Sequence, residues 1–108
     1  MSLLITRRKT MTIEKKKNGQ ELTLAVEGRV DTTTAPELES VCKDSLDGIT
    51  DLIFDLEKLE YISSAGLRVF LSVQKTMNAQ GSMKLIHVSE NVMEVFEVTG
   101  FSDILTIE

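Results

Sequence analysis

The sequence predicts a small single-domain α/β fold with a mixed, mostly parallel sheet, an N-terminal antiparallel hairpin, and helices mainly on one face of the sheet. The chain has 108 residues, which is the size of one domain. Apolar runs with strand spacing alternate along the chain with runs of helical spacing, a pattern typical of parallel strands joined by right-handed crossovers. Residues 22–26 alternate apolar and polar side chains, so we expect one sheet face to stay free of helices.

The first predicted elements are a hairpin and a helix. Residues 11–14 and 22–26 alternate apolar and polar side chains on either side of a turn signal at Asn18-Gly19. The run Thr34-Ala35-Pro36-Glu37 matches a capping box with proline in the first helical turn, and Asp47-Gly48 predicts the end of this helix. The apolar stripe of the helix is formed by Leu38, Val41, Cys42 and Leu46.

The second half of the chain continues the alternation of strands and helices. The short apolar run at residues 52–54 predicts a central strand, and residues 64–79 have the spacing of a long helix. Residues 83–88 predict another strand, Ser89 caps a last helix, and residues 104–107 predict a short terminal strand. The predicted order is therefore β-β-α-β-α-β-α-β.

The charge of the chain, −5 in total, is distributed unevenly. Residues 1–17 hold six basic residues and one acidic residue, whereas residues 18–108 hold six basic and sixteen acidic residues. Because an acidic body repels phosphate backbones and anionic lipids, we expect neither nucleic acid nor a membrane as the main partner. Residues 1–10 are expected to be a solvated extension, and residues 11–108 the folded domain.

The sequence contains few cysteine and histidine residues, the types that catalysis and metal binding often use. One cysteine and one histidine can form neither an internal disulfide nor a structural zinc site of nitrogen and sulfur ligands. Cys42 lies on an apolar helix stripe, where burial is expected to make it inert, and His87 lies in a strand pattern as a structural side chain. No glycine-rich phosphate loop follows a predicted strand. We therefore expect no enzyme, no metal and no cofactor.

From the pattern of apolar residues we expect neither a signal peptide nor a membrane span, and therefore a cytoplasmic protein. The run Leu3-Leu4-Ile5 is much shorter than the roughly 7 to 15 apolar residues of a signal-peptide core. No stretch approaches the roughly 18 apolar residues of a membrane span. A single cysteine agrees with a reducing compartment.

The segment Tyr61–Arg68 carries the strongest functional signal. Two hydroxyls, from Ser63 and Ser64, stand where a helix is predicted to begin. Gly66 is a poor helix former, and we expect it to leave the backbone of the first turn accessible. A serine before a helix is also a preferred cap that stabilises it by about 1 kcal/mol. The serine pair alone therefore fits either a cap or a functional site.

Together with its surroundings, this segment resembles the STAS domain family, in the branch of bacterial anti-sigma factor antagonists. The resemblance covers residues 11–108 and rests on the motif Gly28-Arg29-Val30-Asp31, the strand at residues 51–56, and the run YISSAGLRVFL at residues 61–71. It implies a STAS-like fold and a non-enzymatic switch. Members of this branch bind an anti-sigma factor that is also a serine kinase and thereby displace the sigma factor. The kinase phosphorylates a serine at the start of the second helix, and a PP2C-type phosphatase reverses this.

The resemblance also implies which residues form the site. The family pattern Asp-Ser-Ser-Gly-Leu places the phosphate acceptor two residues before the glycine, which is Ser64 in this sequence. Ser63 replaces the aspartate and becomes an alternative acceptor, and Ala65 replaces the second serine. Asp31 matches an acidic residue that the family holds close to the acceptor. The implied partner-binding surface consists of Asp31, Thr32, Thr33, Thr34, Ser63, Ser64, Ala65, Gly66, Leu67 and Arg68.

Other hypotheses remain open at this point. Because Ser63 replaces the aspartate of the family, the chain also fits an unswitched STAS scaffold subunit of a sensor assembly or transport complex, with Ser64 only as a helix cap. An enzyme would need a nucleophile, a base and an orienting group, and the sequence suggests no such set. The sequence indicates no nucleotide or other small ligand near Asp31 and Ser64.

Overall fold

The computed structural model describes residues 11–108, so the predicted extension at residues 1–10 lies outside the described part of the chain. Within it, the structure forms five strands, three α-helices and one short 3-10 helix. None of these helices is long and apolar enough to cross a membrane. In chain order the elements are β1 (Met11–Asn18), β2 (Glu21–Val30), α1 (Ala35–Ser45), β3 (Asp51–Asp55), β4 (Leu59–Ile62), α2 (Ser64–Gln80), β5 (Ser82–Ile86), α3 (Glu90–Thr99) and η1 (Phe101–Asp103).

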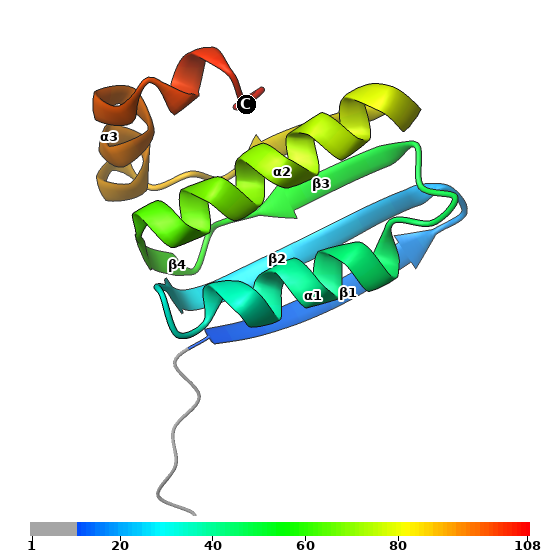
Figure 1. Cartoon of the computed structure of the whole chain (residues 1–108), viewed down its shortest axis with the longest axis horizontal. Helices are drawn as coiled ribbons and strands as arrows, with labels where there is room; N and C mark the ends of the chain where they lie inside the picture. Colours follow the sequence, from blue (N-terminus) through cyan, green and yellow to red (C-terminus); the bar gives the residue numbers. More distant parts are fainter. Residues whose placement is uncertain (1–10) are drawn as a thin grey trace, which may run out of the picture.

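One mixed sheet forms the centre of the structure, with the strand order β1-β2-β3-β5 (Figure 1). Strands β1 and β2 form the predicted antiparallel hairpin, in which Asn18 lies opposite Glu21. All other pairings are parallel. Strand β2 is long enough to pair twice, with β3 along Glu21–Ala25 and with β4 along Gly28–Val30. The prediction of a mostly parallel sheet with an antiparallel hairpin is therefore confirmed.

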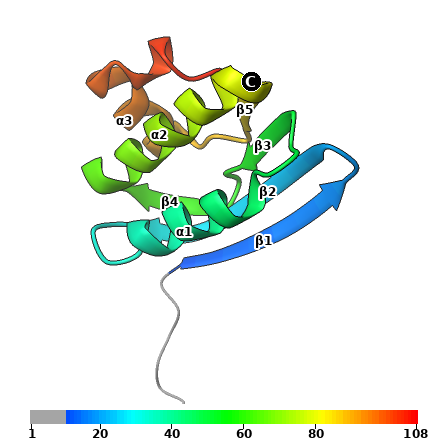
Figure 2. The same cartoon turned by 45° about the vertical axis from the view of Figure 1, so that its right-hand side comes forward.

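Helices α1 and α2 cross the same face of the sheet (Figures 1 and 2). Helix α3 joins this layer through Phe96, whose ring meets that of Phe70 on α2 edge to face with centroids 6.4 Å apart. The Phe70 ring meets Phe54 of β3 in the same way at 4.8 Å. The prediction of helices mainly on one face is confirmed. The largest fully buried side chains belong to Phe54, Phe70, Phe96, Leu24, Leu38, Ile49, Leu52, Leu56, Met77, Leu85, Val26 and Val30.

Strand β4 lies between the predicted central strand and the predicted long helix, where the sequence predicts no strand. Its end residues Leu59 and Ile62 are buried, and Glu60 and Tyr61 between them are exposed. Buried positions three residues apart do not follow the period of two that marks a strand in a sequence. A register shift between Gly28 and Arg29 of β2 accompanies this irregular pairing. Only the neighbouring strand therefore identifies β4.

The end of the chain contains less strand than predicted. The strand expected at residues 104–107 is reduced to a single parallel bridge between Leu85 and Ile107. The strand expected at residues 83–88 ends at Ile86. His87 follows it with a left-handed backbone, at a φ of 59°, and therefore leaves the extended path of the strand.

The capping box predicted at the start of α1 is absent. Thr34 is the N-cap residue but its backbone is helical, and its side chain makes no cap hydrogen bond. The Thr34 hydroxyl instead donates to the Arg29 carbonyl oxygen, 2.8 Å away. Asp31 takes over the role of the cap: its Oδ1 accepts hydrogen bonds from the N–H groups of Thr33 and Thr34 at 2.9 and 3.0 Å. Pro36 lies in the first turn as predicted.

Candidate functional site

Ser63 connects β4 to α2 and caps the helix. Its N–H group donates to the Val30 carbonyl oxygen over 2.8 Å, which holds the start of α2 against the end of β2. Its Oγ accepts a hydrogen bond from the Gly66 N–H group at 3.4 Å, and its carbonyl oxygen accepts one from the Leu67 N–H group at 2.9 Å. Ser63 is half-buried. The hydroxyl of Ser63 is thus used by the helix itself.

Ser64 is the first residue of α2 and is exposed. The first turn of α2 contains no acidic residue, and Arg68, one turn further along the helix, is also exposed. The first N–H groups of a helix lack intrahelical partners and give this end a partial positive charge. Ser64 therefore presents an accessible hydroxyl where an added negative charge is well tolerated.

Gly66 allows the start of α2 to pack closely against the sheet. A Cβ atom at this position would lie 2.7 Å from Val30 Cγ1 and 2.8 Å from Ile62 Cγ1. Real Cβ atoms do not approach other carbon atoms this closely, because dispersion contacts are optimal near 3.5 to 4.0 Å. Gly66 is buried. The expectation that Gly66 leaves the backbone accessible is therefore wrong, and the residue serves close packing.

The loop after β2 lies beside this helix start. Asp31 directly follows Val30, which is hydrogen-bonded to Ser63, and Figures 1 and 2 both place the loop next to the beginning of α2. The hydrogen bond from the Thr34 N–H group, helped by that of Thr33, lowers the pKa of the Asp31 carboxyl group. Asp31 is therefore a fixed negative charge near the two serines.

Burial reduces the part of the predicted surface that a partner could contact. Thr34, Gly66 and Leu67 are buried, so they position the site from below. The members at least partly accessible are Asp31, Thr32, Thr33, Ser63, Ser64, Ala65 and Arg68. Between the first turns of α1 and α2 lies a mostly apolar hollow of about 310 Å³, lined by Thr32, Ala35, Pro36, Glu39, Ala65, Arg68 and Val69.

Four residues that line this hollow were not predicted: Ala35, Pro36, Glu39 and Val69. Part of the signal is present in the sequence, because Ala35 and Glu39 share one face of α1 by their spacing of four residues. Ala65, Arg68 and Val69 share one face of α2 in the same way. The sequence does not say that these two faces adjoin, because that depends on the packing of both helices on one sheet.

The cysteine and the histidine lie outside this site. Cys42 is fully buried on α1, as predicted, and desolvation raises the pKa of its thiol to about 12, which disfavours the reactive thiolate. His87 is not the strand residue that its neighbours in the sequence predict. Its side chain is 57% exposed and contacts Asp55, with 3.0 Å between Nδ1 and Oδ1. This hydrogen bond raises the pKa of the His87 imidazole.

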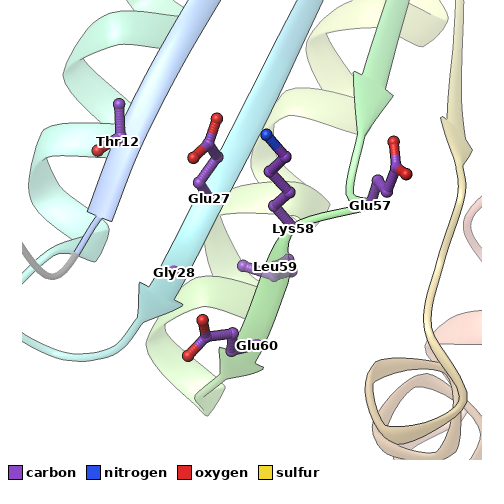
Figure 3. Close-up of a pocket in the computed structure, with 7 residues that line it drawn as sticks. All are labelled: Thr12, Glu27, Gly28, Glu57, Lys58, Leu59 and Glu60. Carbon is purple, nitrogen blue, oxygen red and sulfur yellow. The ribbon is translucent and has the colours of Figure 1, made fainter.

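A larger hollow, of about 470 Å³, lies on the helix-free face of the sheet (Figure 3). Its walls come from β1, β2 and the segment that leads into β4, and they carry Glu27, Glu57, Lys58 and Glu60. In Figure 3 the Lys58 side chain extends between Glu27 and Glu57. The hollow is wide and polar, and it does not include Ser63 or Ser64.

Comparison with known proteins agrees with this geometry. The family model described as STAS domain matches residues 12–108. The chain belongs to the STAS domain family. A putative anti-sigma factor antagonist, BtrV of Bordetella bronchiseptica, is 39% identical over 88 residues, which cover 80% of this chain and 76% of the relative. The anti-sigma-B factor antagonist of Bacillus subtilis is 31% identical over 98 residues, or 90% of each chain.

The fold of this STAS domain is shared with solved structures. The Bacillus cell fate determinant SpoIIAA in its phosphorylated form superposes with a TM-score of 0.70 at 16% identity, over 90% of this chain and 91% of that chain. The predicted STAS-like fold and the predicted family branch are confirmed. These relatives are named anti-sigma factor antagonists, which agrees with the prediction that this chain is not an enzyme.

Proposed function

We propose that the chain is an anti-sigma factor antagonist that binds an anti-sigma factor with serine-kinase activity, and that phosphorylation of Ser64 by this kinase ends the binding. A PP2C-type phosphatase restores the binding form. The anti-sigma factor antagonists among the relatives support the first part of this proposal. The observation that carries the second part is the division of labour between the serines: Ser63 caps α2, and Ser64 is exposed beside it.

The hydrogen bonds favour Ser64 over Ser63 as the acceptor. A kinase must reach the hydroxyl and orient it toward the transferred phosphoryl group, since phosphoryl transfer depends on positioning. The Ser63 hydroxyl is half-buried and accepts the Gly66 N–H group. Its phosphorylation would disturb the cap, whereas Ser64 stands free of this bond at the first helical position.

A phosphate at Ser64 would be tolerated by the domain itself. It would add a charge of about −1.5 to −2 next to the N–H groups that begin α2. Arg68 lies four residues further along the helix and is exposed, so its guanidinium group is placed to pair with the phosphate. The fold is therefore expected to stay intact after modification.

The same phosphate would oppose the binding of a partner. A partner that covers Ser64 and the apolar hollow between α1 and α2 would have to accommodate a bulky dianion in the middle of the interface. Asp31, ionised and fixed by its hydrogen bonds, adds negative charge to the same surface. A loss of about 4 kcal/mol in binding free energy corresponds to roughly a thousandfold weaker affinity.

The direct test combines the purified chain with a serine-kinase anti-sigma factor encoded near its gene. Incubation with ATP and mass spectrometry of the products should locate the phosphate on Ser64. The variant Ser64→Ala should bind the kinase and remain unmodified, and Ser63→Ala should still be phosphorylated. Ser72→Ala is the control, because Ser72 is exposed on the same helix but far from its start.

Two results would contradict the proposal in different ways. If the chain neither forms a complex with the kinase nor becomes phosphorylated, the antagonist function is wrong for that partner class. If it binds and is never modified, and Ser64→Ala binds equally well, then Ser64 only begins the helix and the chain acts as an unswitched STAS scaffold.

A further inference from the structure

Three side chains that can ligate a metal converge on the helix-free face, away from the Ser64 site. Asp55 is the last residue of β3, Glu57 follows two residues later, and His87 is the first residue after β5. Because β3 and β5 are parallel, with Asp55 opposite Ile86, their carboxyl ends meet at one edge of the sheet. One ligand atom from each of the three side chains lies within 4.8 Å of the other two.

The dimensions of this cluster fit a metal ion of the zinc type. Zinc binds imidazole nitrogen and carboxylate oxygen at about 2.0 to 2.2 Å in tetrahedral geometry, so two ligands of one ion lie about 3.3 to 3.6 Å apart. The ligand atoms of this cluster lie within 4.8 Å of one another, so closing around an ion requires a side chain to move by about 1 Å. Glu57 is exposed and is free to make it. Imidazole with carboxylate suits zinc and the neighbouring divalent transition metals.

Hydrogen bonds hold the Asp55 carboxylate, the His87 ring and the Glu57 backbone in place. Asp55 Oδ1 lies 3.0 Å from His87 Nδ1, and the same oxygen accepts the Glu57 N–H group at 3.1 Å. Figure 3 shows the Glu57 carboxylate turned away from Lys58 and Glu27, toward the side of the hollow where β3 ends. The left-handed backbone of His87 directs the chain out of β5 at this point. The end of β3, the loop after it and the loop after β5 thus present their ligands to one point.

The surrounding charge is mixed but favours a cation. The residues that line a neighbouring hollow of about 140 Å³ include four acidic ones, Glu14, Glu27, Asp55 and Glu57, and one basic one, Lys58. Lys16 also acts on Asp55 electrostatically. Acidic residues therefore outnumber basic ones here by four to two, and a surface of this sign concentrates divalent cations.

We propose that Asp55, Glu57 and His87 form a binding site for a divalent transition metal ion of the zinc class. The ion would tie the loop after β3 to the loop after β5, and its remaining coordination positions would be open to water. The single cysteine and single histidine exclude only a zinc site built from nitrogen and sulfur ligands. The site proposed here uses one nitrogen and two oxygen ligands. The proposal does not depend on the phosphorylation switch at Ser64.

The test is a titration of the full-length, metal-free chain with Zn²⁺ by isothermal calorimetry in a non-chelating buffer. We expect saturable binding of one ion. Loss of a ligand should weaken it at least about tenfold, the effect that even outer-shell changes often reach. His87→Asn is suitable because asparagine tolerates a left-handed backbone. Glu57→Gln removes one ligand and one charge, and Glu60→Gln removes the same charge from an exposed neighbour outside the cluster.

A second measurement locates the ion on the chain. In ¹H–¹⁵N spectra, Zn²⁺ should shift the amide signals of residues 55–58 and 86–88 most strongly. The proposal is supported if His87→Asn and Glu57→Gln lose affinity and Glu60→Gln stays within about twofold of the unchanged chain. It is overturned if Zn²⁺ does not bind saturably, or if all three variants bind equally well. Signals that shift only near other residues would overturn it as well.

Discussion

The starts of α2 and α3 use the same cap but place different side chains after it. Ser63 and Ser89 both have an extended backbone, and each accepts a hydrogen bond at 3.4 Å from the N–H group three residues later. The next residue is Ser64 in α2 and Glu90 in α3. Helix α3 therefore carries a permanent negative charge at the position where α2 carries a neutral hydroxyl.

The comparison indicates what a phosphate on Ser64 would change. Glu90 demonstrates that the first position of a serine-capped helix in this domain accommodates an anion, as the helix dipole leads one to expect. A modified Ser64 would resemble the start of α3 in charge. The difference between the two states of the protein would then lie in what can bind to α2, and the stability of the domain would change little.

The largest expected effect comes from giving α2 the charge that α3 already has. Ser64→Asp should weaken binding to the anti-sigma kinase by up to about a thousandfold, because its carboxylate imitates part of the phosphate charge in the interface. Surface plasmon resonance against the immobilised kinase measures this. Ser72→Asp, which adds the same charge two turns further along α2, should bind normally. Equal affinities for both aspartate variants would contradict the expectation that a negative charge at the start of α2 weakens binding.

The second effect concerns the third helical position, which is Gly66 in α2 and Val92 in α3. Gly66→Ala should lower the free energy of unfolding by about 1 to 3 kcal/mol, because its Cβ would collide with Val30 and Ile62. Urea denaturation followed by circular dichroism measures this change. Ser72→Ala should stay within about 0.5 kcal/mol of the unchanged chain. A stable Gly66→Ala variant would show that the start of α2 adjusts easily.

The third effect tests whether the two caps are equivalent. Ser63→Ala and Ser89→Ala should each lower the free energy of unfolding by about 0.5 to 1 kcal/mol, the lower part of the usual range. The reason is that hydrogen bonds of 3.4 Å are long and therefore weak. Thermal and urea denaturation of both variants measure the two losses. A much larger loss for Ser63→Ala would mean that Ser63 has a further structural role.

The smallest effect is a dependence of stability on pH. It arises from the cap of α1, which is an aspartate, whereas the caps of α2 and α3 are serines. Hydrogen bonds from the Thr34 and Thr33 N–H groups lower the pKa of Asp31 below its ordinary 3.8, so folding favours the ionised form. The resulting stabilisation is present above pH 3.8 and is lost as the pH falls through the lowered pKa. Asp31→Asn should therefore be slightly less stable than the unchanged chain near neutral pH. The gap between their urea midpoints should narrow on acidification, and a gap independent of pH would contradict this.

The sequence predicted most elements because their burial follows a regular period. Helix α2, expected at residues 64–79, is observed at Ser64–Gln80, and the hairpin turn is found between Asn18 and Glu21. Strand β4 was missed because its buried residues are three positions apart. The apolar neighbours of His87 predict a strand at this position. In the structure its backbone is left-handed, which ends the strand, and its side chain contacts Asp55, which is distant in the sequence.

The candidate site was predictable in part. The motif around Ser63 and Ser64 located the helix start, and the family pattern singled out Ser64. The sequence does not reveal that Thr34 and Leu67 are buried, or that Pro36 and Glu39 line a hollow beside Ala65. These facts depend on how α1 and α2 pack side by side on the sheet. The spacing of apolar residues within each helix does not specify how close the two helices lie to each other.

The sequence by itself determined the α/β class, the family, and the position of Ser64 at the start of a helix. These follow from local spacing and from short motifs, which act along the chain. The tertiary structure decided which of the two serine hydroxyls is used as a helix cap. The Ser63 N–H group donates to the Val30 carbonyl oxygen, and this places the Ser63 hydroxyl where it accepts the Gly66 N–H group. The tertiary structure also brought Asp55, Glu57 and His87 together, since parallel strands join residues about thirty positions apart at one edge of the sheet. Such contacts between distant residues arise only when the whole sheet has formed.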